Sequence, residues 1–321
     1  MRLNRFARFA WFVVAYNLAV IVWGAYVRAS VSGNGCGSHW PLCNGEVIPT
    51  APQLKTLVEF SHRLTSGLSV VLLVGLAVWA WRAYPKRHRV RRAALLSVVF
   101  IFTEALVGAG LVLFEYVAQN ASVGRALFMS VHLVNTFVLL AVLVLVAWWA
   151  SDAPRVELRG QGRVPYLFAL GLLGTLVLAV SGAVAALGDT LFPARTLAEG
   201  LSRDFSPAAH FLLRLRVLHP ALALAVGCYV VLTASYVSNF LRPAELVKRL
   251  TSLLITIFLL QFGAGLLNVS LLAPVWLQLV HLLLADLLWL ALVVTAAAAL
   301  AEPAAQTAQV EAVNRQTATQ L

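Results

Sequence analysis

Residues 126–149 read ALFMSVHLVNTFVLLAVLVLVAWW, a stretch of 24 residues without one charged side chain. An α-helix needs about 20 apolar residues to cross the hydrocarbon core of a bilayer. The apolar residues run continuously and do not alternate with polar ones, unlike those of a membrane β-barrel strand. This stretch therefore predicts a membrane-spanning helix with a single imidazole, His132, inside it.

The same pattern recurs along the whole chain. Of its 321 residues, 61% are hydrophobic and 12% are charged, whereas a soluble domain has about 45–50% apolar and about 25% charged residues. This composition excludes a disordered chain, a small disulfide-rich secreted protein and a water-soluble enzyme. We therefore predict an all-α integral membrane protein with eight transmembrane helices, at about 9–29, 60–81, 94–114, 126–149, 164–187, 213–236, 250–268 and 276–299.

The basic residues predict how the chain lies in a plasma membrane. The chain has 24 Lys and Arg against 13 Asp and Glu, a net charge of +11. With both termini in the cytoplasm, 16 of the 24 basic residues lie on the cytoplasmic side, most densely at 82–92. The charge thus reports orientation in lipid and requires no nucleic acid. Eight basic residues stay outside and indicate an anionic ligand: Arg28, Lys55, Arg63, Arg125, Arg195, Arg203, Arg214 and Arg216.

Two halves of the chain, 1–150 and 164–299, resemble one another. When they are aligned, Gly24 matches Gly182, His62 matches His219, Gly108 matches Gly263, and His132 matches His281. Four helices per half give both halves the same orientation, unlike the inverted repeats of many transporters. We predict two pseudo-symmetric four-helix bundles in tandem, joined by a cytoplasmic linker at 151–163. The residues from 300 to 321 are predicted to be a disordered cytoplasmic tail.

Four histidines lie inside predicted spans, each a few residues after its helix begins and about 5–10 Å below the outer interface. A single intramembrane histidine is often only a polar residue hydrogen-bonded to a neighbouring helix. Four at a matched depth favour axial ligation of haem iron, by His62 with His132 and by His219 with His281. Arg63 and Arg216 lie close to these histidines and would pair with haem propionates. The alternative is that these arginines only reach towards the interface.

The two halves differ beside their histidines. Glu59 lies three residues before His62 and on the same helix face, and its counterpart is Arg216, while Arg28 corresponds to Ala186. We infer that the first half carries out chemistry on its ligand and that the second half holds a permanent redox cofactor. The alternative is that Glu59 only stabilises the start of its helix. Glu104 and Asp286, the two other deep acids, receive no catalytic role.

Two cysteines, Cys36 and Cys43, lie in the outer segment 30–59, which the predicted orientation places in an oxidising compartment. Three interpretations stay open from the residues alone. The pair can be a structural disulfide, a redox-active dithiol, or part of a copper site with His39.

With these residues placed, the chain resembles the haem A synthase family from residue 9 to residue 299. The resemblance rests on short motifs: Val27-Arg28, Trp40-Pro41-Leu42-Cys43-Asn44-Gly45, Glu59-Phe60-Ser61-His62-Arg63, His132-Leu133, His219-Pro220 and His281-Leu282-Leu283-Leu284-Ala285. Phe60 departs from the family, which often has Tyr at this place.

The resemblance implies oxidation of the C8 methyl group of haem O to a formyl group through a hydroxymethyl intermediate, which supplies haem A to cytochrome oxidase. It places a haem b cofactor, with its iron, between His219 and His281, and substrate haem O between His62 and His132. We assign Arg63 and Arg28 to the haem O site as well. It makes Glu59 the essential acid and Cys36 and Cys43 the paired cysteines. The partners implied are a haem O synthase and an electron donor.

Two alternatives of another class stay open: a dihaem b-type membrane electron carrier linked to quinol, and a haem transporter or chaperone. The difference between Glu59 and Arg216 favours the enzyme, because a simple electron relay does not need it.

Overall fold

The computed structural model of the chain describes residues 3–301, and eight of its helices are long and apolar enough to cross a membrane. They are α1 Arg5–Ala29, α2 Leu54–Ala83, α3 Arg89–Leu113, α4 Val123–Ala150, α5 Val164–Leu191, α7 Phe211–Tyr236 (continued by the π-helical turn η1, Val237–Leu241), α8 Glu245–Ser270 and α9 Val275–Ala299. The prediction of eight apolar helices is confirmed. The tail predicted at 300–321 lies outside the described residues from position 302 onward.

Most helices begin earlier than their hydropathy predicts. Helix α2 starts at Leu54 rather than at about 60, because its first turns carry polar residues that a search for apolar windows leaves out. The four intramembrane histidines therefore lie six to nine residues inside their helices, or about 9–14 Å along the axis. The histidines thus lie farther from the starts of their helices than the predicted spans indicated. A short helix, α6 (Leu197–Asp204), was also not predicted, since it is polar and its Thr196 cap lies in the outer segment.

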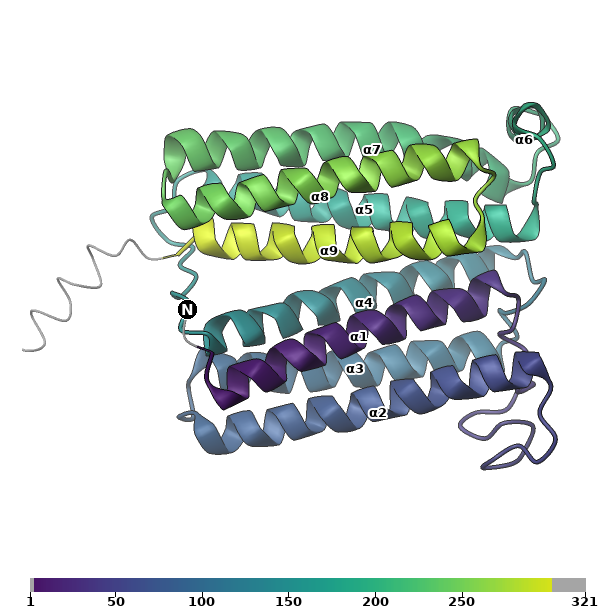
Figure 1. Cartoon of the computed structure of the whole chain (residues 1–321), viewed down its shortest axis with the longest axis horizontal. Coiled ribbons are helices and arrows are strands. Elements are labelled where there is room, and N and C mark those ends of the chain that lie inside the picture. The colour runs from purple at the N-terminus through teal and green to yellow at the C-terminus, as the bar shows by residue number, and fades with distance from the viewer. Residues whose placement is uncertain (1–2, 302–321) are drawn as a thin grey trace, which may run out of the picture.

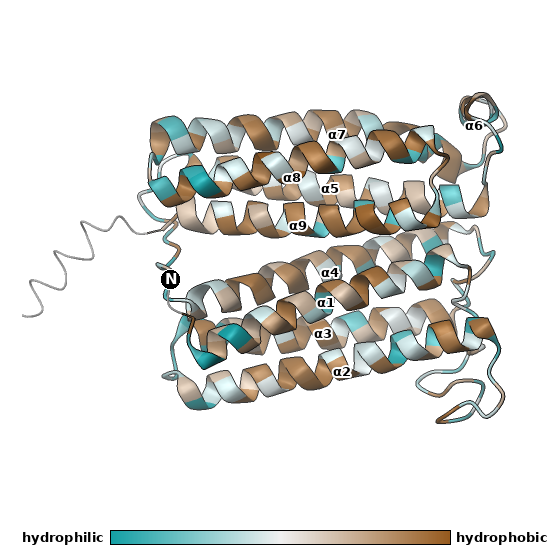
Figure 2. Ribbon diagram, in the orientation of Figure 1, coloured by the Kyte–Doolittle hydropathy of each residue, from teal (hydrophilic) through white to brown (hydrophobic). Residues whose placement is uncertain are grey.

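The spanning helices form two groups (Figure 1). Helices α1–α4 pack together, and α5, α7, α8 and α9 lie beside them, with α4 and α1 facing α9 and α5. The N-terminal residues and the end of α9 lie at one end of the molecule, whereas the cysteine loop and α6 lie at the other. Apolar residues cover the middle of the helices, and polar residues gather towards their ends (Figure 2).

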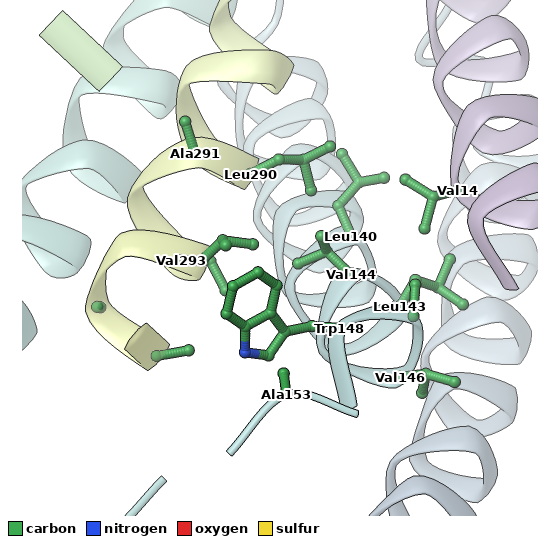
Figure 3. Close-up of a cluster of buried hydrophobic side chains, with 14 of the residues drawn as sticks. Val14, Leu140, Leu143, Val144, Val146, Trp148, Ala153, Leu290, Ala291 and Val293 are labelled. Atoms are coloured by element: carbon green, nitrogen blue, oxygen red, sulfur yellow. The ribbon is translucent and has the colours of Figure 1, made fainter. Parts of the chain in front are cut away.

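The main hydrophobic core lies between the two groups, towards the end that carries the N-terminus. Helix α4 contributes Leu140, Leu143 and Trp148, and α9 contributes Leu290 and Val293 (Figure 3). Helix α9 ends in the small residues Thr295–Ala299, all buried, which allow neighbouring backbones to approach closely. At the opposite end, where the histidines lie, the second buried cluster is small and consists of Ala126, Val184, Leu187 and Leu212.

Candidate functional site

Each intramembrane histidine packs against a glycine of a neighbouring helix. A Cβ atom on Gly24 would lie 2.8 Å from Cε1 of His62, and one on Gly182 would lie 3.0 Å from Cε1 of His219. The corresponding distances are 3.1 Å for Gly265 and His281, and 3.6 Å for Gly108 and His132. The absence of a side chain thus allows His62, His219 and His281 to pack closely against a neighbouring helix, whereas the contact of His132 with Gly108 is an ordinary one.

These contacts correct one detail of the sequence alignment. Gly265, and not Gly263, contacts the histidine of its half, so Gly265 is the counterpart of Gly108. Among residues 3–301, a Cβ placed on Gly263 would contact no atom outside its own stretch of helix within 4 Å. The sequence Gly-Ala-Gly occurs in both helices, and spacing alone cannot show which of its two glycines faces a histidine.

The histidines are arranged in two pairs, one in each half. His62 on α2 and His132 on α4 lie close enough for their charges to interact, and the same holds for His219 on α7 and His281 on α9. All four side chains are half-buried. Each pair therefore offers two imidazoles from facing helices at a similar depth.

The polar groups that lie next to the ring nitrogens differ among the four imidazoles. Nδ1 of His219 lies 2.9 Å from the Ser181 hydroxyl, and Nε2 of His281 lies 3.3 Å from the Gln261 amide. Nδ1 of His132 lies 3.4 Å from Oε1 of Glu104. Nδ1 of His62 is buried without a hydrogen-bond partner among residues 3–301.

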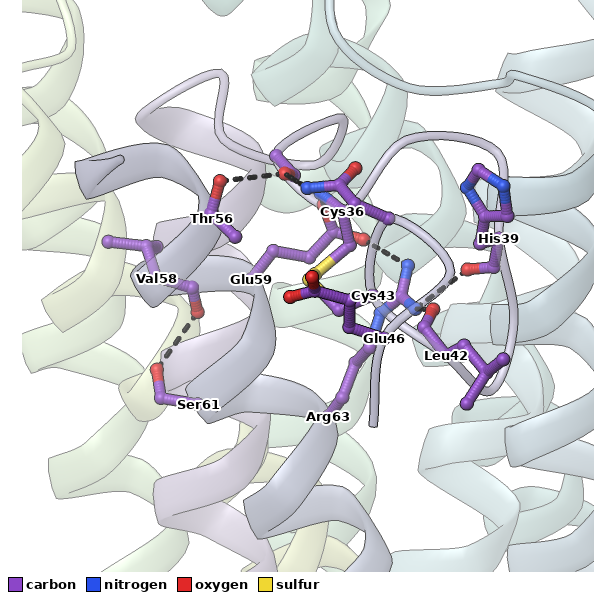
Figure 4. Close-up of a disulfide and its surroundings, with 12 residues drawn as sticks. Cys36, His39, Leu42, Cys43, Glu46, Thr56, Val58, Glu59, Ser61 and Arg63 are labelled. Carbon is purple, nitrogen blue, oxygen red and sulfur yellow. Dashed lines mark hydrogen bonds and ion pairs between the residues drawn. A yellow bond between two sulfur atoms is a disulfide. The ribbon is translucent and has the colours of Figure 1, made fainter. Parts of the chain in front are cut away.

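The carboxylate of Glu59 is buried and joins the cysteine loop to the helix of His62 (Figure 4). Its Oε2 accepts a hydrogen bond of 2.9 Å from the backbone N–H of Cys36, and its Oε1 forms a 2.6 Å ion pair with Arg63. The same Arg63 donates to the carbonyl oxygens of His39 and Leu42, both at 2.7 Å. Glu59 and Arg63 thus hold the loop above the His62 end of the first half.

Cys36 and Cys43 form a disulfide, as the family resemblance implied. The loop rests directly on the start of α2, because a Cβ on Gly35 would come within 2.4 Å of the backbone of Lys55. Thr56 donates a 2.8 Å hydrogen bond to the Gly35 carbonyl at the same place. With both sulfurs joined, the loop offers no thiolate for the copper site, and the structural and redox interpretations both stay open.

The arginines predicted to meet propionates all have protein partners. Arg28 reaches from α1 across to the other half, where it donates to the Ala186 carbonyl, the Thr190 hydroxyl and the Gln278 side chain at 2.7–3.0 Å. Arg216 binds Asp189 at 2.7 Å and pairs through two nitrogens with Asp204. Arg28, Arg63 and Arg216 each make three side-chain hydrogen bonds, and a guanidinium has five N–H donors.

Residues 7–293 match the COX15-CtaA family of cytochrome oxidase assembly proteins, and several similar proteins are haem A synthases. The chain belongs to the haem A synthase family. Together with the eight apolar helices, this makes it a multi-pass membrane protein.

Similar members of the haem A synthase family come from several bacteria. The chain is 47% identical to a haem A synthase of Halalkalibacterium halodurans over 95 residues, which is 30% of this chain and 32% of that protein. It is 32% identical to one from an Exiguobacterium species over 187 residues, which is 58% of this chain and 60% of the relative.

A more similar relative carries another name. A protoheme IX farnesyltransferase of Thermus thermophilus is 53% identical over 297 residues, which cover 92% of this chain and 49% of the relative. The chain therefore spans about half the length of that protein.

The two histidine pairs fit haem as a ligand of this protein. Each half has two imidazoles at similar positions along their helices, each packed against a glycine, and neutral imidazole is a common axial ligand of haem iron. Among residues 3–301 no group of three or more His, Cys, Asp or Glu side chains is arranged to hold a metal ion. A haem needs only two axial ligands from the protein, so the two pairs are sufficient.

Sequence reasoning missed three contacts of this site: Ser181 with His219, Gln261 with His281, and Glu104 with His132. Each contact joins two different helices, whereas sequence spacing shows only neighbours on one helix. Asp286 is also placed: it is fully buried in α9, and neither of its carboxylate oxygens has a hydrogen-bond partner in the described part of the chain.

Proposed function

We propose that this protein is a haem A synthase that oxidises the C8 methyl group of haem O to a formyl group through a hydroxymethyl intermediate. The membership of the family supports an enzyme that acts on haem in haem A synthesis. The observation that carries the proposal is the presence of two glycine-packed histidine pairs, one in each group of four helices.

The two pairs receive different ligands in this proposal. His62 and His132 bind the iron of substrate haem O, and His219 and His281 bind haem b. When bound, haem b supplies reversible one-electron transfer. The domains follow the same division, with a substrate half at 1–150, a linker at 151–163 and a haem b half at 164–299, related as a tandem repeat.

Glu59 is the proposed catalytic acid. It lies three residues before His62 on the same helix, and its carboxylate is buried against the disulfide loop and Arg63. A carboxylate held by two donors keeps a fixed position, and a buried site excludes bulk water from the group that it serves. The carboxylate of Glu59 is thereby held as a proton-accepting group close to His62 and His132.

Arg28, Arg63 and Arg216 are proposed to bind propionates with the N–H donors that their protein partners leave over. Arg63 lies beside His62 for haem O, and Arg216 lies one turn before His219 for haem b. Arg28 is proposed for haem O as well, and its hydrogen bonds to α5 and α9 connect the two halves. Propionates at this level require the haem sites to lie towards the outer leaflet, with both termini in the cytoplasm.

Two partners complete the proposal: a haem O synthase that delivers the substrate and an electron donor. A similar protein of about twice this length carries the name of the farnesyltransferase that acts on protoheme IX. This relationship supports a functional connection between farnesylation of haem and its later oxidation.

The test is pigment extraction from membranes of cells that express this chain together with a haem O synthase. Haem A should accumulate, and cells with the synthase alone are the control. Finding only haem O and haem B would contradict the enzyme and favour a dihaem carrier or a transporter.

Site variants test the roles of individual residues. Glu59→Ala should keep haem b bound and abolish formyl formation, whereas His219→Met or His281→Met should reduce tightly bound haem b. A normal bis-histidine spectrum in both methionine variants would show that this pair does not hold the cofactor.

A further inference from the structure

Glu104 is a carboxylate deep inside the membrane that contacts the side chain of His132. It lies on α3, and its Oε1 is 3.4 Å from Nδ1 of His132 on α4. This nitrogen is buried and makes no hydrogen bond among residues 3–301, and the Glu104 carboxylate is an acceptor within 3.4 Å of it. Acidic residues at such depth are costly and usually face a partner or a functional cavity.

A network of polar side chains holds Glu104 in place. Asn135 donates a 2.6 Å hydrogen bond to Oε2, and the Thr136 hydroxyl donates to Oε1. Asn135 in turn donates to the Phe100 carbonyl at 2.9 Å and accepts from the Thr103 hydroxyl at 2.7 Å. Both oxygens of Glu104 therefore accept hydrogen bonds, and their position relative to His132 is set by two helices.

The second half has a neutral residue at the matching place. Glu104 lies one turn before Gly108, which contacts His132, and Gln261 lies one turn before Gly265, which contacts His281. The Gln261 amide is 3.3 Å from Nε2 of His281. The structural counterpart of Glu104 is thus an amide without a charge.

The supporting residues differ as well. In the alignment that matches His132 with His281, Asn135 and Thr136 correspond to Leu284 and Ala285, which donate no side-chain hydrogen bonds. The polar network around Glu104 therefore belongs to the first half alone. In addition, the carboxylate faces Nδ1 of His132, whereas the amide faces Nε2 of His281.

We propose that Glu104 is a positioning residue that orients His132 and strengthens it as an axial ligand, and that Gln261 does not do this for His281. The inference rests on the proposed haem ligation by these histidines. A carboxylate that accepts from the outer nitrogen of a ligating imidazole fixes the ring and raises its basicity. A more basic ligand stabilises the oxidised iron, so the first-half haem has the lower reduction potential.

The experiment is a redox titration of the purified full-length protein loaded with haem B, in wild type, Glu104→Gln and Gln261→Glu. Glu104→Gln should raise the potential of one haem and leave the other unchanged. Gln261→Glu should lower the potential of the second haem, by a smaller amount because no Asn or Thr supports the new carboxylate. Thr175→Val is the packing control, since the Thr175 hydroxyl bonds the Gly171 carbonyl of its own helix, and it should change neither potential.

Unchanged potentials in both reciprocal variants, with both haems bound, would overturn the proposal. A shift of both potentials by Glu104→Gln would also overturn it, because that result indicates a general structural disturbance. Glu104→Gln is nearly isosteric, and its thermal midpoint shows whether the fold survives. The outcome is separate from the enzymatic one: a protein that forms no haem A but shows the reciprocal shifts keeps this proposal and loses the proposed function.

Discussion

Replacing Gly24 by alanine should stabilise the helix and weaken the haem site at the same time. Gly24 lies inside α1, where alanine is favoured over glycine by about 1 kcal/mol. The new Cβ would lie 2.8 Å from Cε1 and 3.1 Å from Nε2 of His62. Since an ordinary contact begins at 3.4 Å, the imidazole must move by about 0.6 Å.

A displacement of this size exceeds what a ligand site tolerates, because productive geometry requires placement within about 0.5 Å. Overpacking of a filled site costs about 1–3 kcal/mol. Each 1.4 kcal/mol is about a factor of ten in affinity. We therefore expect haem binding to the first half to weaken about ten- to one-hundredfold.

Three alanine variants serve as matched controls. Gly67 and Gly75 both lie inside α2, and a Cβ on either would contact no atom of the described residues within 4 Å, apart from its own stretch of helix. The variants Gly67→Ala and Gly75→Ala should gain helix stability and keep their haem binding. Gly108→Ala, whose Cβ would lie 3.6 Å from His132, makes an ordinary contact and should have little effect.

The assay combines bound haem per protein, measured as the pyridine haemochrome, with haem A extracted from membranes and the thermal midpoint of the purified protein. Gly24→Ala should lose first-half haem and haem A without a lower thermal midpoint. Wild-type haem content and haem A in this variant would refute the reasoning, and so would equal losses in Gly67→Ala.

Three further changes test other parts of the structure. In Arg28→Lys, the compact ammonium group of lysine cannot bind all three acceptors in the second half. We therefore expect the thermal midpoint to fall by the equivalent of about 1–3 kcal/mol. The exposed control Arg195→Lys should leave the midpoint unchanged. The double variant Cys36→Ala with Cys43→Ala removes a loop closure worth about 2–3 kcal/mol and frees the Cys36 N–H from its hydrogen bond to Glu59. Haem A formation should therefore fall while haem b stays bound. Normal turnover with the natural reductant would leave the disulfide a purely structural role. Asp286→Thr should raise the thermal midpoint, because it removes a buried carboxylate without hydrogen-bond partners among residues 3–301. A threonine of similar size can donate a hydrogen bond to a carbonyl of its own helix, as Thr295 does to Ala291. A lower midpoint or loss of haem would assign Asp286 a function.

The fold was predictable from the sequence because a bilayer sets the length of an apolar helix. Residues 126–149 were read as a span, and α4 extends from Val123 to Ala150. The ends were less predictable, since the first turns of α2 contain polar residues that pack against the cysteine loop. The short helix α6 carries no apolar run at all, and its formation depends on its cap and on its place in the outer segment.

The candidate site was predictable only in part. The four histidines are recognisable because an imidazole inside an apolar helix is rare, and Glu59 because it shares a helix face with His62. Which groups surround them depends on contacts between helices. Long arginine side chains donate to acceptors that are distant in sequence, as Arg28 does to Gln278. The spacing of residues along the chain does not predict such contacts.

The difference in charge between the halves looks different once these contacts are known. The sequence contrasts Glu59 with Arg216, yet Glu59 is paired with Arg63, and Arg216 is paired with Asp189 and Asp204. Each of these charges therefore has an opposite charge beside it, and the Arg216 cluster, with two carboxylates against one guanidinium, is not a net positive site. Glu104 has no cation among its described partners, and its counterpart Gln261 is neutral. In the proposed scheme, Glu104 therefore adds a further electrostatic difference between the two histidine pairs, next to His132 on α4, and it would favour the oxidised iron in the first half.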